Sequence, residues 1–182
     1  IRMLRKMWDR GDLEDVMDYL CTIQESAKHD SLQLVVLADF FSRIEFRGNG
    51  LCLDSCVRLL PLLDSILDLS SSSRHLNGSG TLKPASSHIT QSTVKALQSL
   101  MKAFEPLIRN TLLHAKQSSS SSNVDLNNEE RIKKCNICHK SIMNIRKQLT
   151  NLMTNSSIVV DRKLVLSVKE FISFTHKLSI VN

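Results

Sequence analysis

The segment NNEERIKKCNICHKSIMNIRKQLTNLM, residues 127–153, constrains the fold most, because its polar and apolar residues separate on a helical wheel. At about 100° per residue, the side chains fall into two opposite stripes. The polar stripe contains Glu129, Lys133, Asn136, Lys140, Asn144, Lys147 and Asn151, and the apolar stripe contains Cys135, Cys138, Ile142, Ile145, Leu149 and Met153. This pattern predicts a long α-helix with one buried side.

Most of the chain carries similar helical signals. Asp12 is suited to cap a helix over 12–27, where Leu13, Val16 and Leu20 recur at helical spacing. Only five Gly and three Pro occur, and aromatics make up 4% of the residues, which favours helices over a β-sandwich or a Rossmann sheet. The remaining expected helices cover 2–10, 30–46, 52–67, 90–113 and 162–178. We predict an all-α fold of about six or seven helices, as a bundle or a short α-solenoid-like stack.

Three of these segments have distinctive features. The segment 30–46 is apolar nearly all round, which predicts a central buried helix, with a strand through LQLVVL as the competing interpretation. Pro61 and Pro106 lie inside two other helical segments and should kink them or break their hydrogen-bond ladders. The sequences around these prolines also form a faint repeat, which suggests stacked helix pairs but equally fits convergent core patterning.

Two Ser-rich stretches without an apolar period separate the helical segments. We predict loops at 69–89 and 116–126. We further predict one helical domain over 1–155 and an additional C-terminal helix within 156–182 that packs on this domain or extends it. The first residue is Ile rather than Met, so we expect the chain to be part of a longer protein.

Charge is unevenly distributed along the chain. Residues 1–10 carry a net charge of +3, residues 11–68 carry −7, and residues 69–182 carry +10, within a total of +6. Such a bipolar chain suits an acidic polymer on one surface and a basic partner on another. No stretch approaches the roughly 20 apolar residues of a membrane span, so we expect no membrane partner. The odd count of five cysteines favours a reducing compartment over secretion.

The pentapeptide CNICH, residues 135–139, has the C-x-x-C-H form that attaches haem. Haem would require the apolar stripe to enclose a macrocycle and a second axial ligand, which no motif supplies. Zinc would require two further ligands, for which Cys52 and Cys56 are candidates at i, i+4. We interpret Cys135 and Cys138 as buried thiols of a helix core.

No other pattern indicates chemistry. The sequence has no glycine-rich phosphate loop, no H-E-x-x-H and no G-x-S-x-G motif. We therefore expect a chain that is not an enzyme and has no cofactor or metal. Basic charge permits nucleic-acid binding, but aromatic stacking residues are few, and we expect no nucleic-acid partner.

Four blocks in order resemble the C-terminal domain of the katanin regulatory subunit: MWDRGDLEDVMDYL, LCLDSCVRLLPLLDSIL, FEPLIRNTL and NVDLNNEERIKKCNICHKSI. The resemblance covers roughly residues 1–150. The sequence departs from the family in its long Ser-rich stretch at 69–89 and in its unaligned tail beyond about 155. The WD-repeat propeller that precedes this domain in the family either lies outside these residues or is absent from the native chain.

The resemblance implies a non-catalytic, all-helical domain. Such a domain binds the N-terminal domain of the katanin catalytic subunit, an AAA ATPase that severs microtubules, and it binds microtubules and spindle-pole or minus-end proteins. The implied localisation is the cytoplasm and cytoskeleton, at spindle poles or centrosomes. A generic α-helical adaptor with another protein partner is the alternative that the same features permit.

Charge and the resemblance together suggest a partner-binding surface. Tubulin is strongly acidic, so basic residues of the first helical segment and of the segment 127–153 could attract it. A solvated face remains the alternative for the lysines that repeat every seven residues. The single Trp either anchors the first helix internally, which we favour, or serves as an interface hot spot. The candidate residues are Arg2, Arg5, Lys6, Trp8, Arg10, Lys133, Lys134, Lys140 and Lys147.

Overall fold

The computed structural model describes residues 1–44, 46, 51–72, 84–117, 126–154 and 162–179. Within these ranges all regular secondary structure is helical, which confirms the predicted all-α fold. The seven helices of the described residues are α1 (Arg2–Arg10), α2 (Leu13–Ala27), α3 (Ser31–Arg43), α4 (Leu53–Ser72), α5 (Pro84–Gln117), α6 (Leu126–Thr154) and α7 (Arg162–Ser179). None of them is both long and apolar enough to cross a bilayer.

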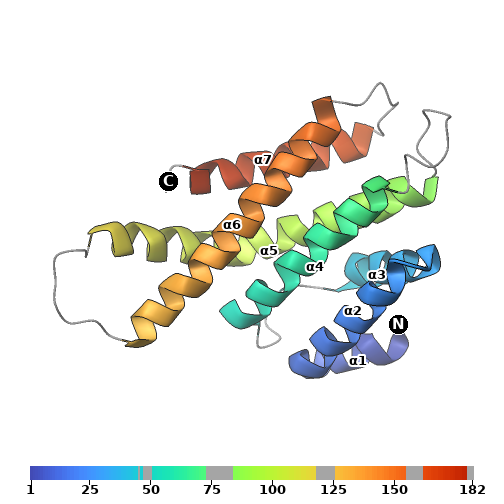
Figure 1. The fold of residues 1–182 in the computed structure, drawn as a ribbon, viewed down its shortest axis with the longest axis horizontal. Coiled ribbons are helices and arrows are strands. Elements are labelled where there is room, and N and C mark those ends of the chain that lie inside the picture. Colours follow the sequence, from blue (N-terminus) through green and yellow to red (C-terminus); the bar gives the residue numbers. More distant parts are fainter. Residues whose placement is uncertain (45, 47–50, 73–83, 118–125, 155–161, 180–182) are drawn as a thin grey trace.

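The helices form two layers (Figure 1). In one layer α2 packs against α4 and α4 against α6, and in the other α3 packs against α5 and α5 against α7. Each helix from α2 onward also contacts helices of the other layer, such as α2 with α3, α4 with α5 and α6 with α7. The chain is thus a short stack of helix pairs, and α1 adds to one end of it through α2.

The long helix α5 occupies the middle of the stack. It contacts α3, α4, α6 and α7. Its segment 89–101 is buried nearly all round, with Val94, Leu97, Leu100 and Met101 fully inaccessible. The same segment also buries the polar side chains Thr90, Ser92, Thr93 and Gln98, as expected of a helix enclosed by its neighbours.

Helix α1 joins the stack through Trp8, which is 1% exposed. The indole lies edge-on to Phe40, at 5.9 Å between ring centroids, and to Phe46, at 5.6 Å. The helix then ends at Gly11, whose φ of 85° is left-handed and favours glycine. This sharp end turns the chain directly into α2.

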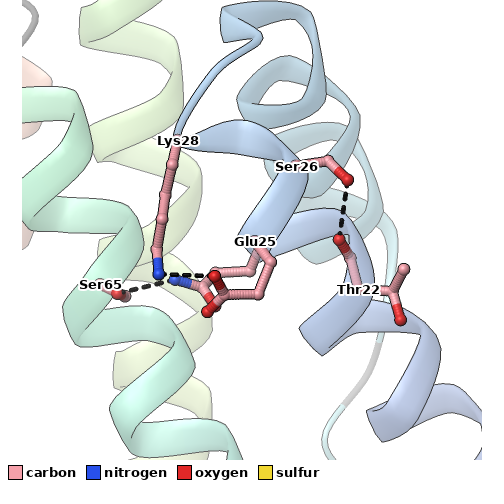
Figure 2. Close-up of polar contacts among 6 residues, drawn as sticks. Thr22, Glu25, Ser26, Lys28 and Ser65 are labelled. Atoms are coloured by element: carbon pink, nitrogen blue, oxygen red, sulfur yellow. Dashed lines mark hydrogen bonds and ion pairs between the residues drawn. The ribbon is translucent and has the colours of Figure 1, made fainter.

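Helices α2 and α4 are joined by polar contacts (Figure 2). Gln24 Nε2 donates a hydrogen bond to Ser65 Oγ at 2.9 Å. At the C-terminal end of α2 itself, Lys28 Nζ lies 2.6 Å from Glu25 Oε2, three residues earlier in the chain. The Arg58 guanidinium of α4 pairs with the Asp18 carboxylate of α2.

The structure corrects two expectations about α3. The competing strand through LQLVVL is excluded, because these residues lie in the helix. The prediction of burial nearly all round is wrong, because Leu32 is 69% and Val35 is 42% exposed. The opposite side, which includes Leu37 and Phe40, packs into the core. Because this segment contains few polar residues, its sequence pattern does not distinguish the exposed apolar side of the helix from the side that packs in the core.

The helices continue through both prolines and into the Ser-rich stretches, so the loop at 69–89 is shorter than predicted at its ends. Pro61 lies within α4 and Pro106 within α5, so neither ends its helix. Both prolines are exposed, and water can solvate the carbonyl that each leaves without an N–H partner. Helices α4 and α5 also extend into the expected loop at 69–89, of which 73–83 lies outside the described residues. Of the second expected loop, 118–125 lies outside them too.

Candidate partner-binding surfaces

The basic residues of α1 lie on its solvent side. Arg2, Lys6 and Arg10 are spaced by four residues and are all exposed. This spacing places them along one helical stripe, opposite the buried Leu4 and Trp8. Arg5 is also exposed, and its guanidinium lies 3.9 Å from the Asp9 carboxylate. The helix therefore presents a short basic stripe.

A second basic stripe lies on α6. Lys133, Lys140 and Lys147 are exposed, on the side opposite the buried apolar stripe of this helix. Because each α-helical residue rises 1.5 Å, the three lysines span about 21 Å along the helix. The structure therefore contains a regularly spaced row of cations on α6.

Lys134 is held by two carboxylates rather than presented to solvent. Its ammonium lies 2.6 Å from Asp54 of α4 and 2.8 Å from Glu130 of α6. Hydrogen bonds to Asp54 and then to Glu130 raise the pKa of Lys134 above its ordinary value. Its charge is locally neutralised, so its role is to connect α4 with α6.

The two basic stripes do not form one surface. Helix α1 packs on α2, α2 on α4, and α4 on α6, so two helices separate α1 from α6 (Figure 1). Both intervening helices are acidic: α2 has four acidic residues and no basic one, and α4 has three acidic residues and one Arg. Trp8 lies on neither stripe, because its side chain is only 1% exposed and packs in the core, as the favoured internal role requires. A part for Trp8 in partner binding stays a prediction.

The cysteines of the CNICH motif lie in the core, as predicted. Cys135 and Cys138 of α6 are both inaccessible, and so is Cys56 of α4. The pKa of the Cys56 thiol is raised well above its ordinary value by its contact with the Cys138 thiol and by burial. His139 Nε2 lies 3.2 Å from the carbonyl oxygen of Leu178 in α7. Across the described residues, no group of three His, Cys, Asp or Glu side chains is placed to hold a metal ion.

The α4–α6 contact also contains a poorly satisfied carboxylate. Asn144 Nδ2 donates to Asp64 Oδ2 at 2.8 Å. The other oxygen, Oδ1, is buried and accepts no hydrogen bond from any described residue. Burial raises the pKa of Asp64, the Asn144 hydrogen bond opposes this shift, and the nearby Asp68 charge adds to it.

Sequence analysis missed a third group of cations. Lys95 and Lys102 of α5 and Lys169 and Lys177 of α7 are exposed. Helices α5 and α7 pack side by side, and Lys102 Nζ lies 5.6 Å from the centroid of the Phe174 ring of α7. A helical wheel of each segment separates them from the core residues, but only the stacking order places the two helices together.

Comparison with known proteins identifies the domain. The family model for the con80 domain of katanin matches residues 1–168. The chain is 26% identical over 159 residues to "Katanin p80 WD40 repeat-containing subunit B1" of Danio rerio, covering 87% of this chain and 18% of that protein. It is 24% identical over 139 residues to the protein of the same name from Xenopus tropicalis, covering 76% of this chain and 17% of the relative.

A third relative of that name, from Gallus gallus, is 23% identical over 154 residues, covering 85% of this chain and 19% of the relative. The chain thus spans less than a fifth of the length of each of these relatives. No solved structure matches the chain significantly. The family match ends at residue 168, inside α7, and the predicted division near residue 155 stays a prediction. The match over nearly the whole chain shows that it belongs to the con80-domain family of katanin.

Proposed function

We propose that this chain is a non-catalytic interaction domain that binds the N-terminal domain of the katanin catalytic subunit, an AAA ATPase. The observation that carries the proposal is the match to the katanin con80 family over residues 1–168. The three relatives are each named a WD40 repeat-containing subunit of katanin, which fits a chain that works within a complex.

The architecture supports an interaction role. Stacked helix pairs present extended outer faces, and helical-repeat proteins use such faces to bind other proteins. The cysteine and histidine side chains that suggested chemistry are instead packed between α4, α6 and α7. The ATP chemistry of severing then belongs to the partner chain, and this chain contributes binding.

A second part of the proposal is that the domain helps bind and target microtubules for severing. The tubulin surface is acidic, and the stripes Arg2–Lys6–Arg10 on α1 and Lys133–Lys140–Lys147 on α6 offer complementary charge. The expected localisation is the cytoplasm and cytoskeleton, at spindle poles or centrosomes. The proposal also includes spindle-pole or minus-end proteins as partners of the domain.

Co-sedimentation with microtubules tests the role of α6. The variant Lys133→Glu/Lys140→Glu/Lys147→Glu should lose most of its pelleted fraction at low salt, and the wild-type fraction should fall as salt rises, because exposed charges are screened over about 10 Å at 0.1 M salt. Lys134→Glu is not a suitable control, because it places a carboxylate beside Asp54 and Glu130. Unchanged pelleting of the triple variant would remove α6 from the proposed surface.

Co-purification tests the catalytic-subunit partner. Co-expressed with the N-terminal domain of a katanin catalytic subunit, this chain should elute from a sizing column with that domain as one complex. A folded chain that elutes alone would favour the generic α-helical adaptor with another protein partner.

A further inference from the structure

Helices α4 and α6 lie side by side and run in the same direction (Figure 1). Lys134 Nζ lies 2.6 Å from Asp54 Oδ1, and Asn144 Nδ2 donates to Asp64 Oδ2 at 2.8 Å. In both contacts the α6 residue comes 80 positions after its α4 partner. The two helices therefore keep one register over about 15 Å, which is the rise of ten helical residues.

Cys56 of α4 and Cys138 of α6 lie between these two polar contacts. Cys56 follows Asp54 by two residues and Cys138 follows Lys134 by four, so the shared register places the two cysteines at neighbouring levels. Both side chains are inaccessible to solvent. Their thiols are in hydrogen-bonding contact. Two thiols from segments far apart in the sequence therefore meet inside the α4–α6 contact.

Cys135, the other cysteine of the CNICH motif, has a different neighbour. Its thiol is hydrogen-bonded to the Thr111 hydroxyl of α5. The same hydroxyl oxygen accepts hydrogen bonds from the Arg131 guanidinium, from Nε at 3.1 Å and from Nη2 at 3.0 Å. Cys135 therefore packs toward α5, whereas Cys138 packs toward Cys56 of α4.

The contact prepares Cys138 to react before Cys56. The Cys56 thiol donates a hydrogen bond to the Cys138 sulfur, which lowers the pKa of Cys138 although burial opposes this shift. The same contact and burial raise the pKa of Cys56. Because the thiolate is the form of cysteine that attacks an oxidant, Cys138 is the attacking sulfur. Cys56 is then the neighbouring thiol that can resolve the product.

We propose that Cys56 and Cys138 form a reversible disulfide that links α4 to α6 when the chain is exposed to hydrogen peroxide. The Cys138 thiolate attacks one peroxide oxygen, the O–O bond breaks, and a sulfenic acid and hydroxide form. The Cys56 sulfur then attacks the sulfenic sulfur, the S–S bond forms, and the S–O bond breaks. The Cys56 proton and the departing hydroxide give water. A dithiol reductant reverses the link by exchange.

Such a link adds regulation to the domain and does not depend on the proposed function. Disulfides in reducing compartments are typically transient and redox-sensing rather than structural. Hydrogen peroxide is close to water in size, so it needs a smaller opening of the core than Ellman's reagent does. A bond from residue 56 to residue 138 would close a loop of about 80 residues and restrict the unfolded chain, so the oxidised form should be the more stable one.

Peroxide treatment of the variant Cys21→Ser/Cys52→Ser tests the proposal. This variant removes the two exposed thiols and keeps Cys56, Cys135 and Cys138. After treatment in native buffer and removal of the peroxide, the thiol count in guanidinium should fall from three to one. Fragmentation of the linked tryptic peptides by mass spectrometry should join Cys56 to Cys138. The melting temperature should rise by about 10 °C and return after dithiothreitol.

Cys135→Ala in the same background is the matched control, because it removes a buried thiol of α6 outside the pair. Its two remaining thiols should both be lost on treatment, whereas Cys56→Ala should form no link. The mapping in the chain that keeps all three core thiols needs neither of these variants to fold. Four results would overturn the proposal: a thiol count that stays at three, a disulfide that includes Cys135, a link that forms only in denaturant, or a lower melting temperature after oxidation.

Discussion

At the residue scale, Trp8 shows how one side chain fixes a helix to the stack. Its ring is covered almost completely and contacts Phe40 and Phe46 edge-on. Edge-to-face aromatic pairs add about 0.5–1.5 kcal/mol to the stabilisation from burial alone. Helix α1 has only Leu4 and Trp8 buried, so most of its attachment depends on this indole.

Replacing Trp8 should therefore affect stability rather than a binding surface. We expect Trp8→Ala to lower the free energy of unfolding by about 3–5 kcal/mol, and Trp8→Phe to lower it by less. Urea denaturation followed by circular dichroism measures both variants. A stability within error of wild type, together with loss of a partner, would show instead that Trp8 acts at an interface.

A second residue-scale prediction concerns Asp64. Because burial raises the folded-state pKa above the ordinary value of 3.8, the folded chain binds a proton more readily than the unfolded chain. The contribution of Asp64 to stability is full below the unfolded pKa and is lost as pH rises through the folded pKa. Asp64→Asn should thus gain stability relative to wild type as pH rises from about 3.8 to 7. Urea denaturation at three pH values tests this, and a difference that does not change with pH would contradict it.

At the scale of elements, α6 is the helix that the sequence describes best. The five side chains that the structure buries on it, from Cys135 to Leu149, all belong to the predicted apolar stripe. Its buried residues recur at helical spacing along one side, so the local pattern is enough to orient it. The partner of that stripe could not be predicted, because it depends on which helices stack against it.

The burial of three thiols gives a prediction at this scale. Cys56, Cys135 and Cys138 should not react with Ellman's reagent in the native protein, whereas Cys21 and Cys52 are exposed and should react. A hydrogen bond from the backbone N–H of Ser55 lowers the pKa of Cys52, which favours its reactive thiolate. We expect two of the five thiols to react without denaturant and all five in guanidinium. Rapid reaction of all five in native buffer would contradict the core position of the motif.

Helix α7 provides the second element-scale prediction. Phe171 is inaccessible, and its helix packs against α5 and α6. Phe171→Ala should lower the free energy of unfolding by about 3–5 kcal/mol. Truncation after residue 155 should expose the side of α5 that α7 covers. The melting temperature of Phe171→Ala is compared with that of Ser173→Ala, a substitution at an exposed position two residues further along α7. A truncated chain as stable as the full one would establish that the domain ends before α7.

At the scale of the whole molecule, acidic and basic helices pack against each other. Helices α2 and α4 are acidic, and α6, which packs on α4 in the same layer, is basic. The sequence predicts the helices, the acidic front and the basic remainder. It does not predict that Lys134 is neutralised by Asp54, or that Lys102 lies over the Phe174 ring, because both depend on contacts between distant segments.

The difference between local sequence pattern and contacts between distant segments also explains why some predicted helix ends differ from the structure. The length of α7 and the start of α2 follow from local apolar spacing and capping positions. The early start of α5 at Pro84 does not follow from local pattern. The Ser-rich composition of 84–88 is typical of a loop, and a proline is compatible with a loop as well as with the first turn of a helix. Exposure of Leu32 likewise depends on which neighbours α3 has.

Isothermal titration calorimetry of this chain with the N-terminal domain of a katanin catalytic subunit tests the central claim most directly. The account predicts tight binding with a stoichiometry of one to one. No heat of binding from a chain shown by circular dichroism to be helical and cooperatively folded would contradict the account, and the generic adaptor would then explain the fold better.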